Sequence, residues 1–176
     1  MKVRAIACAV TAIMVTAEFA SAQSPPSTFP GGASSLRETF QDWQVSCVAE
    51  ANTKRCSLSQ EQVGQNRQRL LAIELAPGDG NGLTGTLILP FGLLFEPPIN
   101  MQVDDKPVGK PLRIRTCVPT GCIVPLRLEG AVTNTMRAGS SLKITAMPSE
   151  SGDPITFSIS LKGFPAAINR TTLLTR

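Results

Sequence analysis

The sequence predicts an all-β fold, an antiparallel β-sandwich of about nine strands with one or two short helices. Short apolar segments alternate with polar residues at the two-residue period of strands, most strictly in 154–161. Clusters of Gly, Pro, Asn and Asp, such as 77–82, separate these segments. Strands and helices do not alternate regularly, so a parallel sheet is not expected. An open barrel is the alternative architecture.

An export signal precedes the predicted domain. Met1–Arg4 is basic, Ala5–Thr16 is apolar, and Ala20–Ala22 has the small-x-small form of a cleavage site. The apolar run is shorter than the roughly 20 residues that a transmembrane helix needs. We therefore expect residues 1–22 to be a cleaved signal peptide, with no transmembrane anchor left after cleavage. The mature chain is then periplasmic or secreted.

The mature chain is expected to contain one domain. Residues 23–35 are rich in Pro, Ser and Gly and cannot bury much apolar surface, so they are predicted to be a flexible leader. Residues 36–176 are predicted to form a single β-sandwich domain, since they show no internal repeat and no second change of composition.

Four strands are predicted in the first half of this domain. In the first, Trp43, Val45 and Cys47 alternate with polar residues and share one face. The second places Cys56 and Leu58 on one face. The third and fourth carry alternating Leu and Ile between polar turns. These segments are 39–47, 55–63, 69–76 and 83–89.

Five further strands and both helices are predicted in the second half. Ala131, Val132 and Met136 have the spacing of one helix face, and Gly139 is a suitable stop. A closing helix is expected near the end of the chain. The strands are 99–103, 112–117, 123–128, 142–147 and 154–161, and the helices are 130–138 and 163–174.

Four cysteines remain after signal cleavage, and an even count in an exported chain predicts disulfides. Four cysteines allow three connectivities. Proximity in the sequence favours Cys47 with Cys56 and Cys117 with Cys122. In the chain-entropy model each such short loop would stabilise the fold by about 2–3 kcal/mol.

The composition argues against an enzyme, a metal site and a bound cofactor. The chain has no histidine, which removes imidazole acid–base chemistry and histidine metal ligands. Neighbouring carboxylates such as Asp104 and Asp105 point to opposite faces or cap a turn. The net charge of +4 is too small to indicate nucleic-acid binding. We predict no catalytic residues, no metal, no cofactor and no nucleic-acid partner.

Two stretches are candidates for function. The apolar run containing Phe91, Leu93, Leu94 and Phe95 is a candidate partner-binding patch, with core lining as the alternative. Trp43 is predicted to anchor the core; the alternative is a platform on which a ligand stacks.

Several landmarks follow one another along the chain. They are the signal peptide, Trp43–Cys47, Cys56–Gln60, Leu89–Leu93 followed by Ile99–Asp104, Cys117 with Gly121–Cys122, and Lys162–Phe164. This ordered set resembles the invasion-associated locus B (IalB) family of α-proteobacteria. The resemblance implies an exported, periplasmic or envelope-associated β-sandwich with two local disulfides and no catalytic residues. The family is named for a contribution to host-cell entry.

We therefore predict an exported, non-enzymatic interaction protein of the periplasm or envelope that contacts an unknown protein or envelope component. A role in host-cell interaction or invasion is part of this prediction. The alternative function is a carbohydrate-binding module, although a single Trp and no Tyr are few aromatics for sugar stacking.

Overall fold

The computed structural model describes residues 28–50, 53–150 and 152–175. The predicted signal peptide, residues 1–22, lies outside these ranges. Within them the chain forms eleven strands, one short 3₁₀ helix and two α-helices. The strands are β1 (Ser35–Phe40), β2 (Trp43–Glu50), β3 (Thr53–Val63), β4 (Arg69–Pro77), β5 (Leu83–Leu89), β6 (Asn100–Val103), β7 (Lys106–Pro107), β8 (Thr116–Val118), β9 (Gly121–Leu128), β10 (Ser141–Ala146) and β11 (Ile155–Ser160). The helices are η1 (Pro30–Gly32), α1 (Gly130–Ala138) and α2 (Phe164–Thr175).

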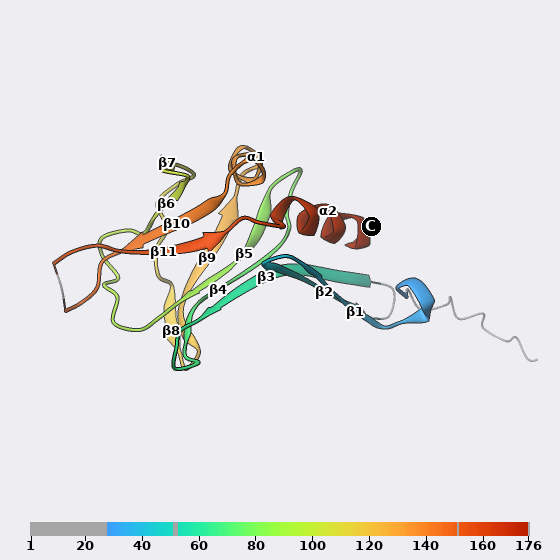
Figure 1. Cartoon of the computed structure of the whole chain (residues 1–176), viewed down its shortest axis with the longest axis horizontal. Helices are drawn as coiled ribbons and strands as arrows, with labels where there is room; N and C mark the ends of the chain where they lie inside the picture. Colours follow the sequence, from blue (N-terminus) through green and yellow to red (C-terminus); the bar gives the residue numbers. More distant parts are fainter. Residues whose placement is uncertain (1–27, 51–52, 151, 176) are drawn as a thin grey trace, which may run out of the picture.

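The strands form two antiparallel sheets, so the predicted all-β fold is confirmed (Figure 1). The larger sheet has seven strands in the order β1-β2-β3-β4-β5-β9-β8. The smaller sheet has four strands in the order β11-β10-β6-β7. Helix α2 packs across β1 to β4, and α1 lies at the start of β10, near α2 (Figure 1). Both helices occupy the segments where the sequence predicts them.

One core runs between the sheets and under α2. It is built from the inward positions of the longer strands, such as β4, β5 and β9, where Leu, Ile and Val recur at every second residue. Strand β2 is typical, because Trp43, Val45 and Cys47 are buried while their neighbours are partly or fully exposed. None of the helices in the described part of the chain is long and apolar enough to cross a membrane.

The first predicted strand, 39–47, is wrong: the structure has a hairpin there. Gln41 adopts a left-handed backbone with φ of 54°, and the chain reverses between β1 and β2. Phe40 therefore pairs with Trp43, and both side chains face inward. A continuous strand would have placed Phe40 on the opposite face, since alternate residues face opposite sides.

The predicted strand 112–117 is also shorter in the structure. Only β8 pairs as a strand there, preceded by a hydrogen bond of 2.8 Å from the Arg115 amide to the Ile123 carbonyl. Leu112 instead forms an isolated bridge with Ile99, the residue just before β6 of the smaller sheet. The residues before β8 therefore lie outside the larger sheet and cover the core, where Ile114 is buried.

Both disulfides join neighbours across a hairpin, as sequence proximity favours. Cys47 of β2 faces Cys56 of β3 with Cα atoms 4.1 Å apart. Cys117 of β8 faces Cys122 of β9 with Cα atoms 3.9 Å apart. Each bond therefore clips one turn of the larger sheet.

Trp43 lies at the centre of the contact between α2 and the sheets. Its side chain is fully buried, and its ring centroid is 5.1 Å from that of Phe164 at the start of α2. Its indole N–H donates a hydrogen bond of 2.9 Å to the Ser160 carbonyl on β11. This residue therefore contacts both sheets and the helix.

The predicted leader, 23–35, is described from residue 28 onwards. Within it Phe29 is 2% exposed, next to η1, and the Lys54 ammonium lies 5.6 Å from its ring centroid. Strand β1 then begins at Ser35. Phe29 is therefore part of the packed domain, although it precedes the predicted domain start at Leu36.

Candidate interaction surface

The loop that connects β5 to β6 carries three exposed apolar side chains. Phe91 is 60% exposed, Leu94 40% and Phe95 52%. We call these three residues the apolar patch. Leu93, the fourth member of the predicted patch, is buried and bridges to Pro148, so it anchors the loop and is not part of the surface.

Hydrogen bonds from the β10–β11 connection hold this loop in place. The Leu94 amide donates to the Met147 carbonyl at 2.8 Å. The Ser149 amide and hydroxyl both donate to the Gly92 carbonyl, at 2.8 and 3.1 Å. Gly92 itself has φ of +81°, a conformation that favours glycine. The patch is therefore presented by a fixed backbone.

The apolar surface continues from Phe91 towards two neighbouring turns. Phe91 shares a hollow of about 360 Å³ with Leu70 of β4 and with the β8–β9 turn, which the second disulfide clips. Leu70 and Val118 are themselves partly exposed. Three connections far apart in the sequence thus meet at one end of the larger sheet (Figure 1).

Charges near the patch are paired. The Arg113 guanidinium forms an ion pair with Glu96, the residue after Phe95. Arg69, beside Leu70, pairs with Glu61 at 2.6 Å. Both pairs are exposed and of the kind that contributes little to stability. They place polar groups around an apolar centre, which is the usual anatomy of a binding surface.

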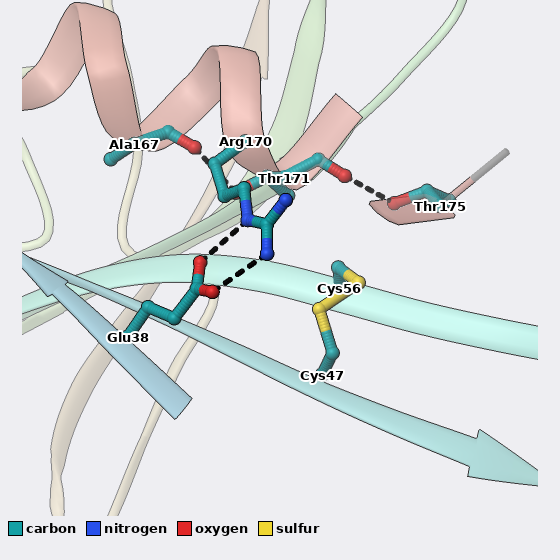
Figure 2. The surroundings of a disulfide bond; sticks show 7 residues. All are labelled: Glu38, Cys47, Cys56, Ala167, Arg170, Thr171 and Thr175. Atoms are coloured by element: carbon teal, nitrogen blue, oxygen red, sulfur yellow. Dashed lines mark hydrogen bonds and ion pairs between the residues drawn. A yellow bond between two sulfur atoms is a disulfide. The ribbon is translucent and has the colours of Figure 1, made fainter. Parts of the chain in front are cut away.

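The strongest electrostatic contact of the described residues lies elsewhere, beside the first disulfide. Figure 2 shows Arg170 reaching from α2 to Glu38 on β1 with two hydrogen bonds, of 2.6 and 2.7 Å. These bonds lower the pKa of the Glu38 carboxyl below its ordinary value, and partial burial opposes the shift. The same bonds raise the pKa of Arg170.

The described residues contain no cluster of three or more Cys, Asp or Glu side chains that would hold a metal ion. Another hollow, of about 920 Å³, lies between β9, α1 and the segment after β7. Leu83, Met101 and Leu128 line it, and the pair Lys110–Glu129, 3.2 Å apart, sits among its lining. Asp104 does not face Asp105: Asp104 accepts hydrogen bonds from the amides of Ser140 and Ser141, and Asp105 pairs with Lys143.

Sequence reasoning missed several residues that shape these surfaces. Leu70 lies beside Phe91 of the patch only because the sheet brings the β3–β4 turn next to the β5–β6 loop, and no local signal indicates this. Gln60 is 8% exposed and bonds to Ser160 of the other sheet. Trp43 shows no ring face to solvent, so the idea of a stacking platform there is wrong.

Two antiparallel sheets and two hairpin disulfides define a small disulfide-clipped β-sandwich. The profile of the family described as Invasion associated locus B (IalB) protein matches residues 43–172. The chain belongs to this family.

Relatives with related names cover most of the chain. An invasion protein B homolog of Brucella abortus (strain 2308) is 37% identical over 174 residues, 98% of each chain. Invasion protein B of Bartonella bacilliformis is 36% identical over 150 residues, covering 84% of this chain and 80% of that protein. The crystal structure of invasion associated protein B from Bartonella henselae aligns with a TM-score of 0.74 and 31% identity, covering 79% of this chain and 96% of that one.

Proposed function

We propose that this chain is an exported, non-enzymatic interaction protein of the periplasm or cell envelope, and that it contacts a protein or envelope component through the apolar patch. The observation that carries the proposal is the exposure of Phe91, Leu94 and Phe95 on a loop held by hydrogen bonds. Large apolar side chains that stay exposed together on a fixed backbone usually mark a binding surface.

Export is supported by the basic and apolar start of the sequence and by two disulfides, which persist in oxidising compartments. N-terminal sequencing of protein taken from the periplasmic fraction is expected to start at Gln23. Protein that starts at Met1 in the cytoplasmic fraction, with four free thiols, would contradict export.

The patch is tested by site-specific photo-crosslinking in living cells. A photoreactive residue at position 91 or 95 is expected to form a discrete crosslinked species. The same residue at Val48, which is 45% exposed on β2, provides the control. Adding L94S to the position-91 probe should abolish the species while near-ultraviolet circular dichroism stays unchanged. Identical crosslinks from position 48, or none from 91 and 95, would reject the patch.

A role in host-cell entry is the finer part of the proposal, supported by the names of the relatives from Brucella and Bartonella. A deletion strain is complemented with wild type, with F91S/L94S/F95S or with V48S. We expect the triple variant to restore uptake by host cells no better than the empty vector, while V48S restores it fully. Full rescue by the triple variant would separate entry from the patch.

A further inference from the structure

A second hollow lies at the opposite end of the larger sheet from the apolar patch, between the two helices. It measures about 560 Å³, and the β4–β5 turn forms its end between α1 and α2 (Figure 1). This volume is within the roughly 300–1,000 Å³ of typical small-ligand sites. Its polar side chains come from three elements: Asn81 from the turn, Asn134 and Arg137 from α1, and Asn169 and Thr172 from α2.

Helix α1 turns one face to the core and another to this hollow. Val132, Thr133 and Met136 are buried against the core. Asn134 and Arg137, three residues apart, lie on the same helix face and line the hollow. The polar face of α1 is thus not simply exposed to solvent, since α2 forms the facing wall of the hollow.

Arg137 is the one ionisable side chain among the residues that line this hollow, all of which belong to the described ranges. Its guanidinium donates a hydrogen bond of 2.8 Å to the Asn169 side-chain oxygen, which fixes it across the gap between the helices. The acidic residue Glu129 lines the neighbouring hollow instead, where it pairs with Lys110. The site therefore presents one positive charge that no lining carboxylate neutralises.

We propose that this hollow is a binding site for an acidic saccharide, with Arg137 holding the sugar carboxylate. A planar guanidinium matches a carboxylate, and one positive charge balances one carboxylate better than a doubly charged phosphate. The amides of Asn81, Asn134 and Asn169 both donate and accept, as sugar hydroxyls require. Leu173, 61% exposed, offers an apolar contact for the C–H face of the ring.

This site is independent of the proposed function, because none of its lining residues belongs to the apolar patch. A failure of saccharide binding leaves the crosslinking result at positions 91 and 95 untouched, and the reverse also holds.

The experiment titrates the isotope-labelled mature chain, residues 23–176, with glucuronate, glucose or inorganic phosphate and follows side-chain amide signals by NMR. Glucuronate is expected to shift the amide signals of Asn81, Asn134 and Asn169. Glucose should bind at least about tenfold more weakly than glucuronate, because hydrogen bonds between charged groups are stronger than those to neutral groups.

Two variants with equal net charge separate a built site from general attraction. R137Q removes the positive charge and keeps a polar side chain, and we expect it to weaken glucuronate binding about tenfold or more. R127Q, at an exposed position of β9 that lines the neighbouring hollow and not this one, is expected to leave binding unchanged. Equal loss in both variants, equal binding of glucose, binding of phosphate alone, or no shift at those asparagines would each overturn the proposal.

Discussion

Gly163 shows how a single residue determines the junction between β11 and α2. Its φ is +84°, and a Cβ built there would lie 1.9 Å from the Phe40 carbonyl oxygen. The next residue, Phe164, is fully buried against Trp43. The glycine therefore allows the backbone of β1 to approach, which is what places the first aromatic side chain of α2 in the core.

We expect G163A to destabilise the fold by more than about 2 kcal/mol, because it adds both backbone strain and a clash with backbone atoms. The matched control is G31A, where φ is +78° and no atom lies within 4 Å of the added Cβ. This control should lose about 1 kcal/mol from the backbone angle alone. Urea unfolding measures both, and equal losses would show that the contact with Phe40 has no effect.

At the scale of elements, α2 is the helix that covers the first hairpin. Ala167, Ile168 and Leu174 on its inner face are buried. Figure 2 shows its outer contact, Arg170 with Glu38, beside the disulfide of β2 and β3. The hydroxyls of Thr171 and Thr175 donate to carbonyls one turn earlier, at 2.8 Å each. Helix, hairpin and disulfide thus form one packed unit.

The pH dependence of this unit follows from Glu38. Its folded pKa is below the unfolded value, so the contact stabilises the fold at pH values above the unfolded pKa, about 4.3 for glutamate. That stability is lost as the pH falls through the folded pKa. We expect the free energy of unfolding of wild type to exceed that of E38Q by a constant amount above about pH 5 and by less below it. Urea unfolding from pH 7 to pH 3 measures this difference.

Arg170 provides the control for this prediction. In an R170Q background, the difference in unfolding free energy between the proteins with Glu38 and with E38Q should no longer decrease at low pH. The reason is that the Arg170 guanidinium is the largest cause of the lowered pKa of Glu38. A gap that narrows equally in both backgrounds would assign the effect to other groups.

At the scale of the whole molecule, side chains connect the two sheets where backbone pairing does not. Strand β11 is an edge of the smaller sheet, and its outer backbone groups need partners. The Gln60 side chain both donates to the Ser160 carbonyl, at 3.0 Å, and accepts from the Ser160 amide, at 3.2 Å. Gln62 donates to the Ser158 carbonyl. Strand β3 thus satisfies the free edge of β11 through amide side chains.

Q60L is expected to destabilise the protein by about 1–3 kcal/mol, because the Ser160 amide loses its partner in a partly buried setting and the Ser160 carbonyl keeps only the Trp43 indole. Q65L, the same substitution at an exposed position in the β3–β4 turn, should change stability by less than about 0.5 kcal/mol. Hydrogen exchange at the Ser160 amide should quicken in Q60L alone. Unchanged exchange there would contradict this role for Gln60.

The sequence alone predicted the class of fold and both helices, and it favoured the two disulfide pairings that the structure shows. These features depend on local signals: the two-residue period in β9 to β11, cysteines separated by a single turn, and the helical spacing of Val132 and Met136. Local signals failed at Gln41, where a two-residue reversal left the alternating pattern looking continuous. They also failed at Leu93, because the contact with Pro148 comes from a distant segment.

Only the tertiary structure decided which surfaces are available for binding. It buried Leu93 and Trp43, left Phe91, Leu94 and Phe95 exposed beside Leu70, and brought Asn81, Arg137 and Asn169 around one hollow. The physical reason is that strand and helix periodicity reflect the burial of one face of each element, whereas a site consists of side chains from loops and faces that meet only when the sheets pack.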